Sequence, residues 1–276
     1  MTTRRRIAGI DFTSRPTRRK PITVALGEAV AGVVRLERVE THADFVSFAA
    51  WLRSPGPWIG GFDFPFGLPR KLVETLGWPR DWLGCMRHYA ALERSAIRAT
   101  FAAFCAARPA GAKFAHRACD GPAGSSPSMK WVNPPVAYML HAGVPLLLDA
   151  GVDLPGLHAG DPDRVALEAY PGLLAREIVG RRSYKSDTVA KQDAARLIAR
   201  KDLVAALEQG RTRLRLRLQL STAAHDELVA DPSGDRLDAV LCLLQAAWAS
   251  GQANHGVPTG VDPLEGWIAS APVPRP

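Results

Sequence analysis

The sequence contains no long uncharged apolar run, and this absence argues against a membrane-spanning helix. No stretch of about 18 residues, the length that a helix needs to cross a bilayer, is both uncharged and apolar throughout. Residues 1–6 include three consecutive arginines and lead into an apolar segment without the apolar core of a secretory signal. These features predict a cytoplasmic protein that does not associate with a membrane.

Cysteine and histidine are too few and too scattered to indicate a zinc site or a disulfide framework. The 4 cysteines include no C-x-x-C pair, and no two of the 7 histidines are spaced i,i+4. We therefore expect reduced thiols. The chain also lacks a Walker-type loop, a dinucleotide-binding fingerprint and an internal repeat, so it does not indicate those classes of nucleotide-binding or repeat protein.

The composition is sufficient for a full hydrophobic core and favours an anionic partner. A chain of 276 residues with 47% hydrophobic content can form one large domain, or a domain with a sizeable insertion. Its formal net charge is +8 at pH 7. Because charge acts on association rather than on fold, this value favours phosphate-bearing ligands without indicating a reaction.

The first 63 residues alternate between strand and helix signals. Apolar runs bounded by turn residues predict strands, and a polar residue before an apolar helical pattern predicts a capped helix. The predicted elements are strands at 5–11, 22–26 and 32–39, a helix that Thr41 or Asp44 caps and that ends at Leu52, and a strand at 58–63.

The rest of the chain has helical periodicity with one further strand. Residues 72–107 have helical spacing, and residues 111–135 are rich in Gly, Pro and Ser, which predicts a helical insertion at about 70–160 that ends in an ordered or mobile loop. This insertion lies within a single predicted domain covering 1–276. The later elements are predicted as a strand at 165–169, a helix starting at Pro171, and helices at 188–207 and 236–248.

Five acidic residues are the main candidates for chemistry. Asp11, Asp63 and Glu168 each stand where an apolar strand is predicted to end, so neighbouring strands would bring their carboxylates together. Asp235 and Asp238 are three apart at the start of a predicted helix and share its face near the positive end of its dipole. Carboxylate oxygens are the ligands that Mg²⁺ or Mn²⁺ prefers. We expect Asp11, Asp63, Glu168 and Asp238 to bind such a metal and Asp235 to assist.

Each of these acids also has a structural alternative. Asp11 could cap the turn that follows it, Asp63 could stabilise the proline-flanked loop at 65–69, and Glu168 could assist the start of the next helix. Asp235 has the strongest alternative, because an aspartate at this place is a natural helix N-cap. Asp238 lies one turn further into the helix and needs no such explanation.

A second group of polar residues is predicted to act on the substrate. His116 is a candidate general acid or base, and Arg117, Asp120, Lys130 and Lys185 are candidates for substrate binding, the cations through phosphate oxygens. The alternatives are a local hydrogen-bonded staple in the loop at 116–120 and an ordinary solvated side chain at Lys185.

Two basic runs have both a functional and a solvated interpretation. Residues 15–20 carry Arg15, Arg18, Arg19 and Lys20, which could position a nucleic-acid backbone beside the predicted metal centre, or could belong to a solvated hairpin. Residues 211–217 alternate arginine with other side chains and predict a basic face if the segment is extended. We interpret this second run as a solvated face.

Four short sequence motifs in a fixed order make the chain resemble the DUF429 family, whose members are predicted nucleases. The motifs are residues 9–14 (GIDFTS), 61–69 (GFDFPFGLP), 168–172 (EAYPG) and 235–239 (DRLDA), with 265–268 (EGWI) closing the chain. The resemblance covers almost the whole sequence. It implies an α/β, ribonuclease-H-like fold with a mixed five-stranded sheet, flanking helices, and a metal centre of acidic residues at strand ends and on the last core helix.

The function expected from the residues and the resemblance is metal-dependent hydrolysis of phosphodiester bonds in DNA or RNA. Two alternatives from other classes remain. One is a non-catalytic nucleic-acid-binding module, in which the acids are structural and the arginines bind. The other is an ATP-dependent phosphotransferase of the actin-like type, although such enzymes normally need two copies of the fold and this chain is short for that.

Overall fold

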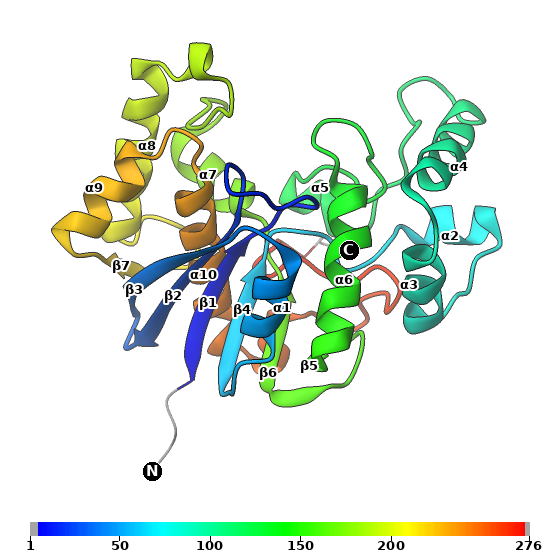
Figure 1. The fold of residues 1–276 in the computed structure, drawn as a ribbon, viewed down its shortest axis with the longest axis horizontal. Helices are drawn as coiled ribbons and strands as arrows, with labels where there is room; N and C mark the ends of the chain where they lie inside the picture. Colours follow the sequence, from blue (N-terminus) through cyan, green and yellow to red (C-terminus); the bar gives the residue numbers. More distant parts are fainter. Residues whose placement is uncertain (1–4, 274–276) are drawn as a thin grey trace.

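One mixed β-sheet runs through the centre of the molecule, and helices cover both of its faces (Figure 1). The computed structural model describes residues 5–273. Within this range the strand order is β5-β6-β4-β1-β2-β3-β7, and β2 is the strand that runs antiparallel to its neighbours. The bounds are Arg6–Asp11 (β1), Ile22–Val30 (β2), Val33–His42 (β3), Trp58–Phe62 (β4), Val152–Asp153 (β5), Asp161–Glu168 (β6) and Arg217–Gln219 (β7).

The sheet has seven strands rather than the five that the family resemblance implied. The two additional strands, β5 and β7, lie at opposite edges and contain 2 and 3 residues. Strands this short show no period-two pattern, so the sequence did not indicate them. β7 lies at the end of the arginine-rich run at 211–217, where Arg215 has a φ of 53° and interrupts the extended backbone that the alternation predicted.

Ten α-helices and two short 3₁₀ helices connect the strands in the described part of the chain. The bounds are Phe45–Leu52 (α1), Arg70–Leu76 (α2), Trp82–Ala90 (α3), Arg94–Ala106 (α4), Asp120–Ala123 (α5), Val136–Ala150 (α6), Pro171–Val179 (α7), Ala194–Glu208 (α8), Thr222–Ala230 (α9), Asp235–Ser250 (α10), Val189–Lys191 (η1) and Ala253–Gly256 (η2). None of these helices is both long and apolar enough to cross a bilayer.

Several predicted helix boundaries are confirmed, and others were wrong. Asp44 rather than Thr41 caps α1, because its side chain accepts a hydrogen bond of 2.8 Å from the Ser47 amide. The helix predicted at 188–207 begins later, where the side chain of Asp193 caps α8. The sequence did not indicate α6, which contains Pro145, or α9. The predicted loop at 111–135 contains the four-residue helix α5.

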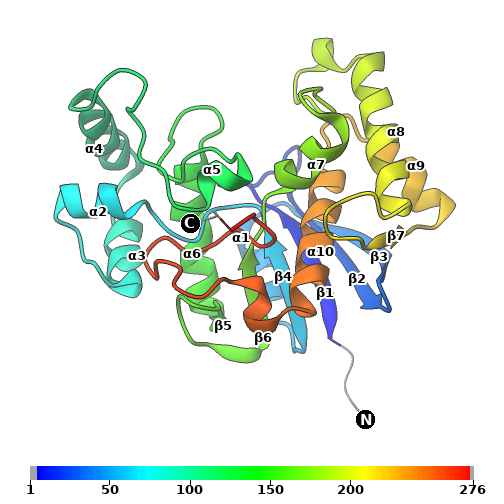
Figure 2. The ribbon, with the colours of Figure 1, turned by 180° about the vertical axis from the view of Figure 1, so that it is seen from behind.

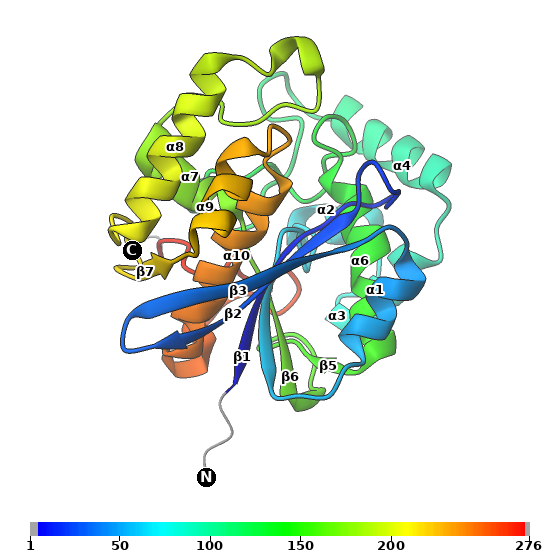
Figure 3. The same ribbon diagram turned by 60° about the vertical axis from the view of Figure 1, so that its left-hand side comes forward.

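The sheet separates two hydrophobic clusters, because successive side chains of each strand point to opposite faces. In β1, Ile7 belongs to the cluster shared with α7–α10, whereas Ala8 and Ile10 belong to the cluster shared with α1–α4 and α6. Figure 3 shows the sheet nearly edge-on between these two groups of helices. The helices α2–α6 form most of the predicted insertion, and the apolar side chains of α2–α4 and α6 complete the second of these clusters.

Helix α10 lies across β1 and β4 at an unusually close distance, and two glycines make this possible (Figure 2). A Cβ atom at Gly9 would overlap the carbonyl oxygen of Ala239, and one at Gly61 would lie 2.6 Å from the carbonyl oxygen of Cys242. Side chains two residues apart in a strand share a face. Asp11 and Asp63 therefore point to the same face as these glycines, toward the first turn of α10.

Candidate metal centre

Asp11, Asp63 and Asp238 each contribute one carboxylate oxygen to a group whose oxygens all lie within 4.8 Å of one another. Asp11 is the last residue of β1, Asp63 follows the last residue of the parallel strand β4, and Asp238 lies in the first turn of α10. Asp11 and Asp238 are buried and Asp63 is half-buried. We call these three residues the carboxylate group. They are three of the four residues that the sequence predicted as metal ligands.

Mutual repulsion and burial raise the pKa of two members of the carboxylate group, Asp11 and Asp63. Burial raises the pKa of Asp11 well above its usual value, and the charges of Asp238 and Asp235 raise it further. Burial and the charge of Asp238 raise the pKa of Asp63 to about 7. Carboxylates at this distance destabilise one another's ionised forms, so a bound cation would relieve a free-energy penalty that the folded chain carries.

Two side chains from the segment before η1 contact Asp238. The ammonium of Lys185 donates a hydrogen bond to one carboxylate oxygen of Asp238, and the hydroxyl of Tyr184 donates to the other. The charge of Lys185 also lowers the pKa of both Asp11 and Asp63, against the burial that raises them. In this structure Lys185 therefore lies as a cation beside all three carboxylates, and its role as a phosphate ligand stays a prediction.

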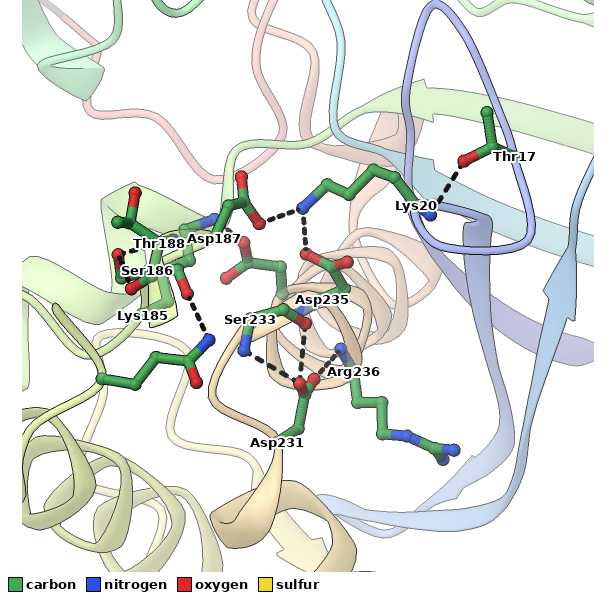
Figure 4. Close-up of polar contacts among 12 residues, drawn as sticks. Thr17, Lys20, Lys185, Ser186, Asp187, Thr188, Asp231, Ser233, Asp235 and Arg236 are labelled. Atoms are coloured by element: carbon green, nitrogen blue, oxygen red, sulfur yellow. Dashed lines mark hydrogen bonds and ion pairs between the residues drawn. The ribbon is translucent and has the colours of Figure 1, made fainter. Parts of the chain in front are cut away.

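Asp235 lies beside the carboxylate group and pairs with Lys20 (Figure 4). The Lys20 ammonium donates to Asp235 Oδ1 at 2.7 Å and to Asp187 Oδ1 at 2.9 Å, so it joins the hairpin after β1 to α10 and to the segment before η1. The structural alternative for Asp235 was wrong. Gly234 is the N-cap residue of α10, and the side chain of Asp231 accepts from the backbone amides of residues 233 and 236 at the start of this helix.

Glu168 lies outside the carboxylate group, although it was predicted as a fourth ligand. Arg117 donates to Oε1 of Glu168 at 2.6 Å and to Oε2 at 2.7 Å, and the Phe66 amide donates to Oε2 at 2.9 Å. Burial raises the pKa of Glu168, while the charge and hydrogen bonds of Arg117 lower it. Both oxygens of Glu168 are occupied by protein donors in this structure, so its role as a metal ligand stays a prediction.

The predicted substrate residues fall into two classes. Arg117 and Asp120 are buried and bonded to each other, with Arg117 Nη2 to Asp120 Oδ1 at 2.9 Å, so the local staple that the sequence left open forms between these two. His116 is exposed and takes no part in that staple. Lys130 is half-buried. Neither His116 nor Lys130 is among the residues that line the cavities beside the carboxylate group.

A groove of about 690 Å³ opens beside the carboxylate group, between the hairpin that follows β1 and helix α7. The acidic part of its lining consists of Asp11, Asp63, Asp187 and Asp235. Basic side chains face the same groove, and they are Lys20, Arg176, Arg181, Arg182 and Lys185. An anionic ligand in the groove would therefore lie between these cations and the carboxylates.

Comparisons of the chain with protein-family models, curated proteins and solved structures gave no match. The function must therefore be inferred from the arrangement of its own residues.

The donors in the carboxylate group fit a hard divalent cation. All three are carboxylate oxygens, the ligand type that Mg²⁺ and Mn²⁺ prefer, and no thiolate or imidazole belongs to the group within the described residues. Cys242, one turn further along α10, is a soft side chain on which the charges of the carboxylate group act. Burial and the charges of Asp63 and Asp238 raise its pKa well above the usual value, so its thiol stays protonated.

Sequence reasoning missed three residues that shape this region. Tyr184 holds Asp238, Lys20 holds Asp235, and Glu265 accepts from the amides of Arg70 and Ala118 at 2.8 Å each, which ties the last segment of the chain to the insertion. Tyr184 precedes a predicted site residue, and Glu265 opens the closing motif at 265–268. Lys20 was recognised only as part of a basic run, because no spacing rule connects it to an acid 215 residues away.

Proposed function

We propose that this protein is a divalent-cation-dependent nuclease of the DUF429 type, built on a ribonuclease-H-like sheet. The five longer strands β3-β2-β1-β4-β6 correspond in number to the sheet that the resemblance implies, with β5 and β7 as additions at the edges. Acidic residues at two strand ends and on the last long helix α10 match the implied positions of the metal ligands.

The observation that carries the proposal is the carboxylate group itself. Three acids from segments far apart in the sequence place one carboxylate oxygen each within 4.8 Å of the others, and Lys185 is the lysine that donates a hydrogen bond to the group within residues 5–273. A Mg²⁺ or Mn²⁺ bound there would stabilise the charge that develops on a phosphodiester during hydrolysis. Asp11, Asp63 and Asp238 would hold it.

The groove supplies the residues that bind the substrate. Arg176 and Arg181 face it without a carboxylate partner in residues 5–273, so they are free to bind phosphate oxygens of a nucleic-acid strand. Arg176 is oriented by its hydrogen bonds to the hydroxyl of Tyr170 and the carbonyl oxygen of Gly172. Lys185 exchanges its contact with Asp238 for a phosphate when the carboxylate group is occupied, which returns it to the role that the sequence predicted.

One contact favours a second function. Because Lys185 already neutralises part of the carboxylate group, the same geometry suits a non-catalytic nucleic-acid-binding module in which Lys185 and Asp238 are a permanent ion pair. In that case the acids would position the arginines of the groove, and the protein would bind a strand without cutting it.

Calorimetric titration of Mg²⁺ and Mn²⁺, combined with cleavage of labelled DNA and RNA, tests the proposal. We expect the wild type to bind the ion and to cut, and Asp63→Asn to lose at least about 100-fold in both properties, because one of three ligands becomes neutral. Asp149→Asn removes a carboxylate from an exposed position of α6 and serves as the matched control. Unchanged strand binding in all three proteins, with no ion binding and no cleavage, would support the non-catalytic module instead.

A further inference from the structure

A second pocket, of about 450 Å³, lies beside the groove and shares two lining residues with it, Ser14 and Pro135. The other residues around it are Arg15, Arg94, Ser95, Arg98 and Tyr138. We call it the arginine pocket. Three guanidinium groups contribute to this lining and no carboxylate does, so its charge is opposite to that of the carboxylate group beside the groove.

The wall of the arginine pocket is held in place by Arg94. Its Nη2 atom donates to the carbonyl oxygen of Ser14 at 2.7 Å, and its guanidinium lies over the ring of Tyr138, 5.1 Å from the centroid. These contacts join the first turn of α4, in the insertion, to the hairpin that follows β1. The pocket is therefore formed by three segments, namely residues 14–15, residues 94–98 and residues 135–138.

The charges in the arginine pocket are not neutralised by the protein. Neither Arg15 nor Arg98 has a side-chain hydrogen bond or ion-pair partner within residues 5–273, and both are exposed. Burial lowers the pKa of Arg94, and the like charge of Arg15 lowers it further. Many other arginines of the chain pair with a carboxylate, namely Arg35, Arg38, Arg70, Arg117, Arg164, Arg182, Arg196, Arg213 and Arg236. Like charges held together without a counter-charge favour binding of an anion.

We infer that the arginine pocket binds a backbone phosphate of the nucleic-acid strand that occupies the groove, at a position away from the phosphodiester that the carboxylate group acts on. The inference rests on the proposed function for the identity of the strand. Guanidinium groups bind phosphate oxygens through paired hydrogen bonds, and the hydroxyls of Ser14 and Ser95 offer additional donors. Because the pocket and the groove meet at Ser14 and Pro135, one continuous strand reaches both.

Strand binding without metal tests the inference separately from catalysis. The probe is a fluorescein-labelled single-stranded oligonucleotide in EDTA, and anisotropy is followed over a series of salt concentrations. We expect the double variant Arg15→Gln/Arg98→Gln to bind about tenfold more weakly. The slope of log K against log salt should become shallower by about 0.7 for each phosphate that the variant no longer binds. Arg98→Lys keeps the charge and should retain most of the slope.

The control is Arg87→Gln, which removes an exposed arginine of α3 that lines neither cavity. A double variant with the same dissociation constant and salt slope as this control overturns the inference. Pocket-dependent binding of inorganic phosphate, with strand binding unaffected, also overturns it, because the pocket would then take a free anion. Thermal melting of each variant verifies folding, and both substituted arginines are exposed, so we expect little change.

Cleavage in Mn²⁺ is measured on the same proteins so that the two proposals can fail independently. A protein that binds the strand through the arginine pocket but does not cut it supports the inference and contradicts the nuclease function. A protein that cuts, and whose pocket variants bind the strand as tightly as the wild type, supports the nuclease function and overturns the inference.

Discussion

Two groups of charged side chains lie at neighbouring strand ends. In one group the opposite charges neutralise each other, and in the other the negative charges are in excess. At the end of β6, Glu168 and Asp120 share the guanidinium of Arg117, and all three side chains are buried. At the end of β4, whose residue Phe62 is in register with Glu168, the carboxylate group brings three acids together beside Lys185. The first group is complete within the chain, whereas the second has an excess of negative charge.

This difference separates a structural role from a functional one. A buried ion pair whose donors and acceptors are all satisfied needs no ligand, and removing one member leaves an unpaired charge in the interior. A set of carboxylates that raise one another's pKa is stable only with protons or a cation. Glu168 was expected to join Asp11, Asp63 and Asp238 as a metal ligand, and Arg117 and Asp120 were expected to bind the substrate. In the structure Glu168 is instead paired with Arg117, and only the other three acids lie close enough together to share an ion.

The largest expected effect comes from removing the positive charge from the buried group of Arg117, Glu168 and Asp120. Arg117→Met leaves Glu168 and Asp120 buried without their cation, so we expect the free energy of unfolding to fall by about 3–5 kcal/mol in urea denaturation. Mg²⁺ and Mn²⁺ should not restore it. Arg182→Met is the control, because its ion pair with Asp202 is exposed and should contribute less than about 1 kcal/mol. A destabilisation at Arg117 as small as that of the control would remove the distinction between the two groups.

A smaller effect is expected from removing one charge of the carboxylate group. Asp63 has a pKa of about 7 in the folded chain against an unfolded value of 3.8, so the folded state binds its proton more tightly. Its contribution to stability therefore declines as the pH rises from about 4 to about 7 and is constant above that. The difference between the two pKa values corresponds to about 4 kcal/mol, and because Asp63 is half-buried, solvent screens part of this penalty. We expect Asp63→Asn to be more stable than the wild type by about 2 kcal/mol at pH 8 in EDTA, and equal to it near pH 3.

Urea denaturation at a series of pH values measures this difference. Addition of Mn²⁺ should reverse the order at pH 8, because the ion stabilises only the protein that binds it. Parallel pH profiles for the two proteins in EDTA would show that Asp63 carries no electrostatic penalty, and the contrast with the group around Arg117 would then disappear.

The smallest expected effect is on metal affinity, and it concerns Lys185, whose positive charge neutralises part of the negative charge of the carboxylate group. Lys185→Met removes the cation that competes for Asp238, so we expect Mn²⁺ to bind about tenfold more tightly, equivalent to about 1.4 kcal/mol. Calorimetric titration measures the affinity, and Lys201→Met removes an equal charge from an exposed position of α8 as a control. Weaker binding in the Lys185 variant would mean that this lysine assists the ion rather than replacing it.

The sequence was sufficient to place the strands that carry the site, for a physical reason. β1 and β4 are buried on both faces, so they read as apolar runs, and a charged residue at the end of such a run stands out. Asp11 and Asp63 were found in this way. Asp238 was found because its helix has a clear apolar pattern and a second acid three residues before it.

The partners of the site residues were beyond the reach of sequence patterns. Arg117 and Glu168 are 51 residues apart, and Lys185 and Asp238 are 53 apart, so no local periodicity connects them. Glu168 ends an apolar strand just as Asp11 does, and only the position of Arg117 in the insertion distinguishes the two. Short elements such as β5 and irregular ones such as the proline-containing α6 were missed for a related reason, because tertiary contacts rather than propensity stabilise them.

The glycines at positions 9 and 61 would influence which ion the proposed metal centre binds. Each stands two residues before an acid of the carboxylate group, and each lets α10 approach the sheet more closely than any side chain would allow. The distance from Asp238 to the two strand ends is therefore fixed by backbone packing rather than by flexible side chains. Mg²⁺ binds oxygen at about 2.1 Å and Ca²⁺ at about 2.4 Å. We therefore expect the spacing between helix and sheet, which depends on the absence of a Cβ atom at both glycines, to favour ions of one radius in the proposed metal centre.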